Sequence, residues 1–557
     1  MTSGVRKIWL GAAAVVVLAA GYSFLAWAAP ARPISPDESA NMFFAREVAE
    51  RSRLAVPEPL NALVGGIIHP RSVRAVGDRL LPGGFIGWPV ALGALGKAIG
   101  LDAVPYAAAL LAALAVLAWG ALVSRFFGRA VGFAAAALLA IQPVWWYWAS
   151  RPYMPNAGFL VLLIGSLWFA VAAAFPRPGR WARVPFWAEA AVGGLLFAVT
   201  FAVRPAEAHW LALGGLLTVV LFRRALDWRR LAAFLAAAAL GALPWLAENF
   251  HLYGSLLATG YGQDALGIPV DEAPQGGGAR LLGALRPYLF PLGFAPRTAL
   301  QRFWEYAVAG QPLWAGLVFA AFLLAFWRLL NADRRSSPDR RNALGAEPYR
   351  VAAILAAVSF WLVLYYGSYA VQDLPADGSV TLGVSYYRYW LPIFVVGTVP
   401  AAWAATVLGE RLGRWRPAVM SVCYGLLAFA SFWQVFHQPG SGLLALRATL
   451  SRQDGEVQAV LAATEPDAVI VCDQADKLLF PERRVITPLR SEATYEALGR
   501  LAGRVPLYYY GISLPPQDIS FLRDVRLEPF GLGVETVRPF RLETLYRLPV
   551  VGRPDAL

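Results

Sequence analysis

Residues 8–29, IWLGAAAVVVLAAGYSFLAWAA, are followed closely by residues 33–53, PISPDESANMFFAREVAERSR. The first stretch is long and apolar enough to cross a bilayer, which takes about 20 residues. The second stretch sets two carboxylates, Asp37 and Glu38, just beyond that run, in a chain of which only 15% is charged. The rest of the sequence has to explain why an acid pair stands at the edge of a membrane span.

The composition of the whole chain is that of a membrane protein. Of its 557 residues, 58% are hydrophobic, and the mean hydropathy is +0.50, which is far more apolar than a soluble domain of this size. The net charge of +13 is carried mostly by arginines in short clusters between apolar runs, as in cytoplasmic loops. We therefore interpret the basic balance as a mark of topology and not of nucleic-acid binding.

Eleven apolar runs predict membrane-spanning helices. They lie near residues 8–29, 104–123, 131–148, 157–175, 186–203, 207–222, 231–247, 311–330, 350–366, 390–408 and 417–436. The first run ends in AWAAPA, which resembles a signal-peptidase site, so a cleaved signal peptide is the alternative there. We expect an uncleaved span because the apolar region is long. A further stretch at residues 83–100 is glycine-rich and short for a crossing, so we expect it to lie in the membrane interface.

The arginine clusters indicate the orientation of the spans. If residues 83–100 do not cross the membrane, five arginine-rich loops fall on the cytoplasmic side, and if they cross, all five lie outside. The positive-inside rule therefore favours eleven spans, a cytoplasmic N-terminus and an outward C-terminus. We expect a polytopic α-helical domain at residues 1–439 with interfacial helices in a first outward loop, 30–103. A small extracytoplasmic α/β domain would follow at 440–557.

Two segments near the C-terminus support the α/β assignment. PDAVIVCD, from residue 466, and VPLYYYGISL, from residue 505, have the pattern of short buried strands. Helical or turn segments such as SEATYEALGRLAG separate them. The two cysteines do not suggest a disulfide framework, because Cys423 lies in an apolar run and Cys472 in this distal segment.

The stretch after the acid pair has the pattern of a helix on the membrane plane, with Phe43 and Val48 set roughly against Glu47. In such a helix Asp37 can help to form the N-terminal cap, with Glu38 in the first turn. Capping explains both acids locally. Closeness to the bilayer does not by itself make an acid catalytic.

Five further polar clusters fall on the same predicted outward face, and all combine charged, amide or aromatic groups. They are His69 and Arg71 in HPRSVR, Arg151 and Asn156 in WWYWASRPYMPN, Arg204 and Glu207 in RPAEAHW, Asn249 and Tyr261 in ENFHLYGSLLATGYG, and Arg388 in SYYRYWLP. Basic groups here can bind a lipid phosphate, with nonspecific contact to anionic headgroups as the alternative. The aromatic side chains suit interfacial anchoring or sugar stacking. His69 is not assigned to a metal, because the four histidines show no ligand spacing.

The order of these motifs resembles the GT-C superfamily of polytopic glycosyltransferases. The matching features are an outward Asp-Glu pair after the first span, an interfacial helix, and then HPRS, PGGFIGWPVALGALGKAIG, SRFFGR, IQPVWWYWASRPYMPN, GLLFAVTFAVRP, ENFHLYGSLLATGYG and RYWLP. The most similar members are family-39-like and aminoarabinose-transferase-like enzymes, which use polyprenyl-phosphate sugars. The resemblance covers residues 5–410.

The resemblance implies transfer of a sugar from a polyprenyl-phosphate donor to a hydroxyl of a lipid, glycan or protein acceptor. Transfer would occur on the outer face of the cytoplasmic membrane, with inversion. Asp37 matches the family's first-loop Asp, a general base or a group that orients the acceptor, and Glu38 matches the second acid of that motif. Arg388 is favoured for the departing lipid phosphate because the family's RY-x-x-P lies near the donor pocket. Arg71, Arg151 and Arg204 are the other candidates for that role.

One position departs from the family pattern. Many relatives carry an Asp in the second outward loop, where this sequence has Asn156. An amide oxygen can join Asp37 in holding a divalent metal ion, but it supplies no second negative charge. Metal dependence is therefore left open, and no other cofactor is expected.

Two other functions are weighed against glycosyl transfer. A GT-C-like protein that binds a lipid-linked glycan without transferring it would be consistent with Asn156. A lipid or sugar transporter would be expected to show internal repeats and broken helices near the bilayer midplane. The sequence instead gathers its acids and arginines at the predicted outer edge.

Overall fold

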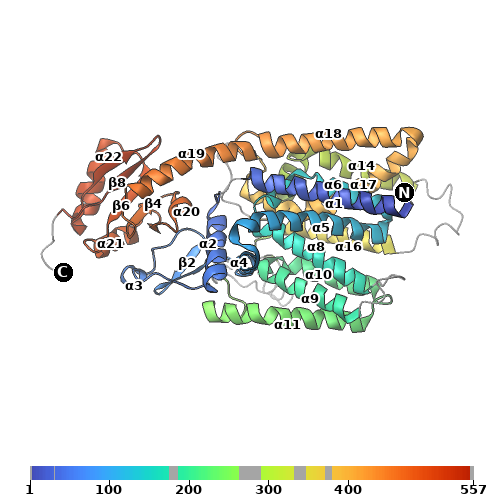
Figure 1. Ribbon diagram of the computed structural model, residues 1–557, viewed down its shortest axis with the longest axis horizontal. Coiled ribbons are helices and arrows are strands. Elements are labelled where there is room, and N and C mark those ends of the chain that lie inside the picture. Colours follow the sequence, from blue (N-terminus) through green and yellow to red (C-terminus); the bar gives the residue numbers. More distant parts are fainter. Residues whose placement is uncertain are drawn as a thin grey trace, which may run out of the picture. The chain divides into compact units, whose positions relative to one another are not determined.

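A computed structural model describes residues 3–29, 32–174, 186–261, 290, 292–330, 347–369 and 379–551 (Figure 1). The chain forms two compact units, each made of three separate segments. The helical unit comprises Met1–Ala29, Pro105–Trp245 and Gln263–Ala445. The mixed unit comprises Pro30–Val104, Leu246–Gly262 and Leu446–Leu557, and contains helices and two sheets.

The helices of the helical unit are mostly long and apolar, and the long ones run nearly side by side (Figure 1). They are α1 (Ser3–Ala28), α5 (Val104–Phe127), α6 (Arg129–Ala140), α7 (Pro143–Ala149), α8 (Pro155–Ala174), α9 (Phe186–Val203), α10 (Ala208–Phe222), α11 (Trp228–Tyr253, which continues into the mixed unit), α13 (Pro296–Phe303), α14 (Pro312–Leu330), α16 (Glu347–Gly367), α17 (Leu391–Arg411) and α18 (Arg416–His437). Short 3₁₀ segments, η3 (Pro205–Glu207) and η7 (Ser385–Trp390), lead directly into α10 and α17.

Seven helices in the described part of the chain are long and apolar enough to cross a membrane, or up to nine if each bent pair counts as one span. The bent pairs are α6 with α7, at 57°, and the π-helical continuation of α13 with α14, at 105°. Two shorter apolar stretches, Ala13–Ala28 and Trp187–Val203, coincide with the first and fifth predicted spans. Every predicted run thus corresponds to an apolar helix or a bent pair in the described part of the chain.

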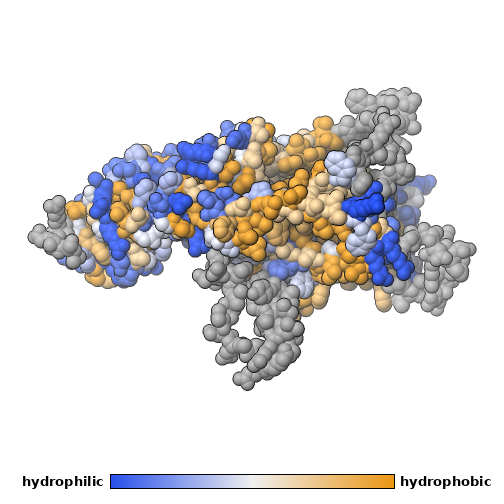
Figure 2. Space-filling view, turned by 90° about the horizontal axis from the view of Figure 1, so that it is seen from below, coloured by the Kyte–Doolittle hydropathy of each residue, from blue (hydrophilic) through white to orange (hydrophobic). Residues whose placement is uncertain are grey.

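The outer surface of the helical unit is apolar. Figure 2 shows hydrophobic residues spread over the face of these helices that it presents. Large apolar side chains stand exposed on them, including Phe133, Leu216 and Phe326. A surface of this kind suits lipid and not water, because patches of this extent are rare on soluble monomers. The chain is a multi-pass membrane protein with backbone hydrogen bonds satisfied within helices.

The mixed unit carries two sheets and several short helices. Its elements are α2 (Pro36–Arg51), β1 (Val56–Pro57), α3 (Asn61–Val64), β2 (Val73–Val76), β3 (Arg79–Pro82), α4 (Gly87–Ile99), α19 (Leu443–Ala462, entering from the helical unit), β4 (Val469–Cys472), α20 (Asp476–Leu479), β5 (Arg484–Ile486), α21 (Glu492–Leu501), β6 (Leu507–Ile512), α22 (Pro516–Phe521), β7 (Glu535–Pro539) and β8 (Glu543–Arg547). One sheet is antiparallel with order β1-β3-β2, and the other has order β5-β4-β6-β8-β7. In the larger sheet β5, β4 and β6 are parallel, and β8 and β7 continue antiparallel.

The C-terminal strands form where the sequence predicts them. β4 lies within PDAVIVCD and is buried along its whole length, because apolar side chains cover both faces of a parallel strand. β6 lies within VPLYYYGISL. Tyr495, Leu498 and Leu501 of α21 pack in the same core. A small C-terminal β-sheet domain is therefore present.

The first loop packs with the C-terminal segment. Val64 and Ile68, on and just after α3, belong to the buried core of the larger sheet. The predicted division assigned residues 30–103 to the transmembrane domain, whereas the compact units group residues 30–104 with 446–557. The burial of these two apolar side chains gives the physical reason for the grouping.

Residues 83–100 contain a helix too short to cross a membrane. α4 has 13 residues and is absent from the candidate spans of the described chain. It packs against α2 at Gly93, where a Cβ would lie 2.6 Å from Cβ of Val48. This glycine of the apolar run thus allows close contact between two helices of the first loop.

Candidate functional site

The two acids of the opening stretch have different environments. Ser35 is the N-cap of α2, and its hydroxyl accepts a hydrogen bond from the backbone N–H of Glu38. In return, Oε2 of Glu38 accepts from the backbone N–H groups of Ile34 (2.9 Å) and Ser35 (3.1 Å). This is a capping box, which satisfies otherwise unpaired donors at the start of a helix. The local capping hypothesis thus describes Glu38 well.

Asp37 points away from the cap, to the loop before β2. Its Oδ1 accepts a hydrogen bond of 2.7 Å from the hydroxyl of Ser72. The neighbouring His69 has its Nδ1 2.9 Å from the carbonyl oxygen of Pro70. Arg71 faces Asp476 of α20, with 2.6 Å between Nη2 and Oδ1. The structure thus commits Arg71, a candidate phosphate ligand, to an ion pair with the C-terminal sheet domain.

Asn249 and Tyr261 lie at the end of α11 and beyond it. The buried amide of Asn249 donates to the carbonyl oxygen of Leu256 (3.3 Å), which closes the turn after the helix. Tyr261 is half exposed and packs edge-on against Phe85, with ring centroids 5.0 Å apart. A Cβ at Gly84 would lie 3.5 Å from its hydroxyl. In the loop after β3, Gly84 therefore lies against the Tyr261 side chain, and the adjacent Gly83 contacts the Ser72 backbone.

A buried polar cluster lies where α9 meets α10 in the helical unit. Nε of Arg204 donates to Oε1 of Glu207 at 2.6 Å, and both side chains are buried. The hydroxyl of Tyr366 bonds to Glu207 and also accepts from Nη2 of Arg204 at 3.2 Å. Nε1 of Trp210 donates to the second Glu207 oxygen at 2.5 Å. The carboxylate is thus fully engaged, as a buried charge requires.

Tyr389 links this cluster to Arg388. The guanidinium carbons of Arg204 and Arg388 each lie 5.3 Å from the centroid of the Tyr389 ring. Nη1 of Arg388 lies 2.7 Å from Sδ of Met154. The amide of Asn156 donates to the backbone oxygen of Arg388 at 3.4 Å. The structure therefore brings Asn156, Arg204 and Arg388 together from three separate predicted loops.

Arg151 is a further buried arginine among the described residues of this unit. Its guanidinium lies over Trp148, 4.7 Å from the centroid of one indole ring, and 5.8 Å from the Tyr147 ring centroid. It sits in the short connection from α7 to α8, where Pro155 begins the next helix. Aromatic side chains of the run WWYWASRPYMPN therefore pack against a buried cation of the same run, in addition to any role in interfacial anchoring.

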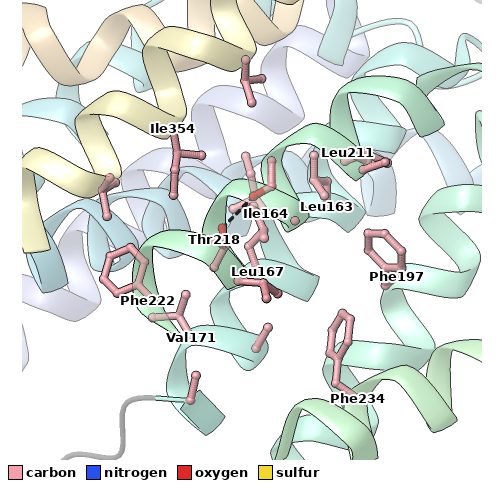
Figure 3. Close-up of a pocket in the computed structure, with 18 of the residues that line it drawn as sticks. Leu163, Ile164, Leu167, Val171, Phe197, Leu211, Thr218, Phe222, Phe234 and Ile354 are labelled. Carbon is pink, nitrogen blue, oxygen red and sulfur yellow. Dashed lines mark hydrogen bonds between the residues drawn. The ribbon is translucent and has the colours of Figure 1, made fainter. Parts of the chain in front are cut away.

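An apolar cavity of about 730 Å³ lies between α8, α9, α10, α11, α16 and α17 (Figure 3). Leucine, isoleucine, valine and phenylalanine side chains point into it, and Thr218 turns its hydroxyl back to the carbonyl oxygen of Gly214 (2.7 Å). Trp210 also lines the cavity and joins it to the polar cluster through Glu207. Asp227 and Arg230 line it near the opposite end of α10.

Sequence reasoning missed four residues of these clusters: Ser72, Tyr366, Tyr389 and Asp476. Tyr366 and Tyr389 stand in the tyrosine-rich motifs YYGSY and SYYRYW, and their density at helix ends was the available signal. Asp476 follows a buried parallel strand, a place where polar groups often serve a site. No local sequence signal marks Ser72 as a site residue.

Metal binding stays a prediction that rests on Asp37 and Asn156. In the part of the chain that the structure describes, no group of three or more His, Cys, Asp or Glu side chains is arranged to hold a metal ion. Oδ1 of Asn156 is buried and has no hydrogen-bond donor among the described residues. A neutral amide oxygen of this kind suits a hard cation only as one ligand among several.

The chain has the GT-C fold that the resemblance in the motif order implies. The chain is similar to ArnT from Cupriavidus metallidurans bound to undecaprenyl phosphate, with a TM-score of 0.59 and 12% identity over 98% of each chain. The apo state of that protein gives a TM-score of 0.54 and 14% identity, also over 98% of each chain. The archaeal oligosaccharyltransferase AglB from Archaeoglobus fulgidus gives a TM-score of 0.49 and 11% identity over 93% of this chain and 70% of that one. No protein-family model matches the sequence, and no curated protein matches it.

Proposed function

We propose that the chain is a membrane glycosyltransferase that moves a sugar from a polyprenyl-phosphate donor to an acceptor hydroxyl. The reaction takes place on the outer face of the cytoplasmic membrane, with the N-terminus inside and the C-terminal domain outside, because the arginine-rich loops favour that orientation. The observation that carries the proposal is an apolar cavity joined to a buried cluster of arginine and tyrosine. The solved ArnT structure with undecaprenyl phosphate supports the same class of donor.

The cavity has the chemistry of a site for a long hydrocarbon chain. α10 lines it from Ala208 to Phe222, a length of about 20 Å at 1.5 Å per residue. Its volume lies within the range of ligand pockets in general. An apolar chain entering it would leave no polar group unpaired, since the walls offer almost none. A polyprenyl tail fits this description.

The polar cluster supplies positive charge beside the cavity. Arg204 is paired with Glu207, and Arg388 contacts Sδ of Met154 and the hydroxyl and ring of Tyr389. A phosphate placed near Arg388 would gain charge-assisted hydrogen bonds, which are about twice as strong as neutral ones. We assign Arg388 to the lipid phosphate and Arg204 to holding Tyr389 in place.

The reaction itself needs one base and one stabilised leaving group. As the acceptor oxygen forms its bond to the anomeric carbon, Asp37 takes the hydroxyl proton. The bond between the anomeric carbon and the phosphate oxygen breaks, and the polyprenyl phosphate leaves with the electron pair. Attack from the face opposite the leaving group inverts the anomeric centre. Positive charge at the phosphate stabilises the developing anion.

Turnover of a panel of undecaprenyl-phosphate-linked sugars tests the proposal. Purified protein in proteoliposomes, supplied with a cell-envelope extract as acceptor, should release undecaprenyl phosphate from at least one donor. Asp37→Asn should abolish release while the protein remains folded and inserted. The matched control is Asp78→Asn, an exposed acid of the same loop, which should leave the rate unchanged. Full activity of Asp37→Asn would overturn the assignment of the base.

Binding without transfer is the alternative that Asn156 favours, because its amide cannot supply the second acid of many relatives. That function predicts saturable binding of undecaprenyl phosphate together with no release from any donor in the panel. The same preparation distinguishes the two outcomes.

A further inference from the structure

The C-terminal sheet contacts the first loop through residues 474–480, which follow β4 and contain α20. Asp476 in this segment is fully buried. One of its oxygens accepts from the backbone N–H of Arg71 at 2.8 Å. Its carboxylate also accepts from Nε of Arg71 at 3.1 Å and from Nη2 at 2.6 Å. A single buried side chain therefore fixes both the backbone and the guanidinium of Arg71.

The residue after Arg71 has an uncommon backbone conformation. Ser72 has a φ of 62°, in the left-handed region, which non-glycine residues occupy only when the surroundings hold them there. The N–H of Gly83 donates to its carbonyl oxygen at 3.0 Å, and a Cβ at Gly83 would lie 2.6 Å from that oxygen. In this conformation the Ser72 hydroxyl donates to Asp37 at 2.7 Å.

The same segment holds the helix that carries Asp37. The hydroxyl of Ser39 donates to the carbonyl oxygen of Lys477 at 3.2 Å. The rings of Phe43 and Phe480 pack edge-on with centroids 4.6 Å apart. Residues 474–480 therefore contact both sides of the hydrogen bond between Ser72 and Asp37.

We propose that residues 474–480 of the C-terminal domain position Asp37 for the reaction, through Arg71 and Ser72 on one side and through α2 on the other. The inference rests on the proposed function, in which Asp37 accepts the proton of the acceptor hydroxyl. Ser72, Arg71 and Asp476 are positioning residues in this scheme. A hydrogen bond to one carboxylate oxygen fixes the direction of the other, and a misplacement of about 1 Å can lower a rate about 100-fold.

Two variants break this arrangement at different points. Asp476→Asn weakens the hold on Arg71. Ser72→Gly removes the hydroxyl and at the same time relieves the left-handed backbone, because glycine adopts positive φ freely. The matched control is Glu58→Gln, which breaks the 3.0 Å pair with Arg484. That pair also joins the first loop to the larger sheet, but it involves neither Asp37 nor Ser72.

Steady-state release of undecaprenyl phosphate from the donor panel provides the readout. Both Asp476→Asn and Ser72→Gly should lower kcat by about 10- to 100-fold, with KM for the donor within about twofold. Ser72→Gly should not lower the thermal unfolding temperature, which separates positioning from a structural role. Glu58→Gln should keep the kcat of the unmodified protein.

The outcomes separate this inference from the proposed function. If Asp37→Asn is inactive while Ser72→Gly and Asp476→Asn keep full kcat, the positioning role is overturned and the glycosyl transfer stands. If Asp37→Asn is fully active, the assignment of the base fails. If the unmodified protein releases no undecaprenyl phosphate, hydrogen–deuterium exchange decides. Asp476→Asn must then raise exchange at residues 36–40 and 71–73 relative to Glu58→Gln, and unchanged exchange overturns the coupling.

Discussion

Nε of Arg204 lies 2.6 Å from Oε1 of Glu207, three residues along the chain, and both side chains are buried within the helical unit. Two more donors, Tyr366 and Trp210, complete the coordination of the carboxylate. Desolvation of the two charges offsets much of their Coulomb attraction in a buried pair of this kind. The main effect of the pair is therefore that each charge keeps the other from being buried without a partner. It holds the junction of α9 and α10 next to the cavity, where an unpaired charge would be unfavourable.

Glu207→Leu should destabilise the protein by about 3–5 kcal/mol, because it leaves the Arg204 guanidinium buried without its carboxylate. The double variant Arg204→Met/Glu207→Leu should recover most of that loss, since neither charge then remains. Chemical denaturation in detergent measures both. The exposed pair of Arg500 and Glu496 is the matched control, and Arg500→Met should have little effect. A double variant as unstable as the single one would contradict this account.

The cavity should be the binding place of the polyprenyl chain, and one glycine tests this. Gly215 lines the cavity, and a Cβ added there meets nothing within 4 Å. Gly215→Phe should therefore place its ring in the cavity without a backbone clash, and should weaken undecaprenyl phosphate binding at least tenfold. Native mass spectrometry or a fluorescence titration in detergent measures the affinity.

Gly425 of α18 is the matched control for that substitution. It is exposed, a Cβ there also meets nothing within 4 Å, and it does not line the cavity. Gly425→Phe should leave the affinity unchanged. Equal weakening by both variants would indicate a general disturbance of the helical unit, and unchanged binding in Gly215→Phe would place the lipid elsewhere.

The two adjacent acids should separate in function. Glu38→Gln keeps an oxygen that can accept from the N–H of Ile34 or Ser35, as the capping box allows. We expect it to retain activity within about threefold and to lose only about 0.5–1 kcal/mol of stability, from the helix-dipole interaction. Asp37→Asn should show the reverse, with stability kept and turnover lost. Turnover and thermal unfolding on the same preparations check both, and an inactive but stable Glu38→Gln would give the second acid a chemical role.

Much of the fold could be predicted because its signals are local. An apolar run of suitable length indicates a membrane helix wherever it stands in the chain, and the glycines of residues 83–100 distinguished a shorter helix from a span. The sequence Ser-Pro-Asp-Glu allowed a cap, and the structure forms one with Glu38. The buried strand β4 was visible as four consecutive apolar residues.

The pairings between distant segments could not be predicted in this way. Arg71 and Asp476 are 405 positions apart, and no local pattern couples them. Glu47 was expected on the polar face of its helix, yet it is buried, and its Oε2 accepts a hydrogen bond of 2.7 Å from Nε of Arg53. A charged residue can be buried once a partner is supplied from elsewhere, and periodicity alone does not reveal the partner. The burial of Val64 in the sheet core could not be predicted for the same reason, because its partners come from distant segments.

The C-terminal sheet should show a pH dependence that depends on one hydrogen bond. The hydroxyl of Tyr508 donates to Oε2 of Glu465 at 2.7 Å, and this bond, more than the nearby arginines, lowers the pKa of Glu465. Burial, together with the Glu465 charge, raises the pKa of Tyr508 to about 12. Because the carboxyl pKa is lowered in the folded state, the bond stabilises the fold at pH values above the unfolded-state pKa. This stabilisation is lost as the pH falls through the folded-state pKa. Because the phenol pKa is raised in the folded state, the bond also stabilises the fold at pH values below the unfolded-state pKa of the phenol. That stabilisation is lost as the pH rises through about 12.

Tyr508→Phe should therefore destabilise the C-terminal sheet by about 1 kcal/mol near neutral pH, and by progressively less below the ordinary carboxyl range. The effect should be modest because the Glu465 side chain is 43% exposed. Pulse proteolysis of the full-length protein in detergent, with fragments of residues 466–551 quantified across pH, measures the free energy of unfolding. Glu465→Gln should remove the acid-side dependence. A loss in Tyr508→Phe that persisted undiminished in acid would show that packing of the ring, and not the hydrogen bond to an ionised carboxylate, carries the stabilisation.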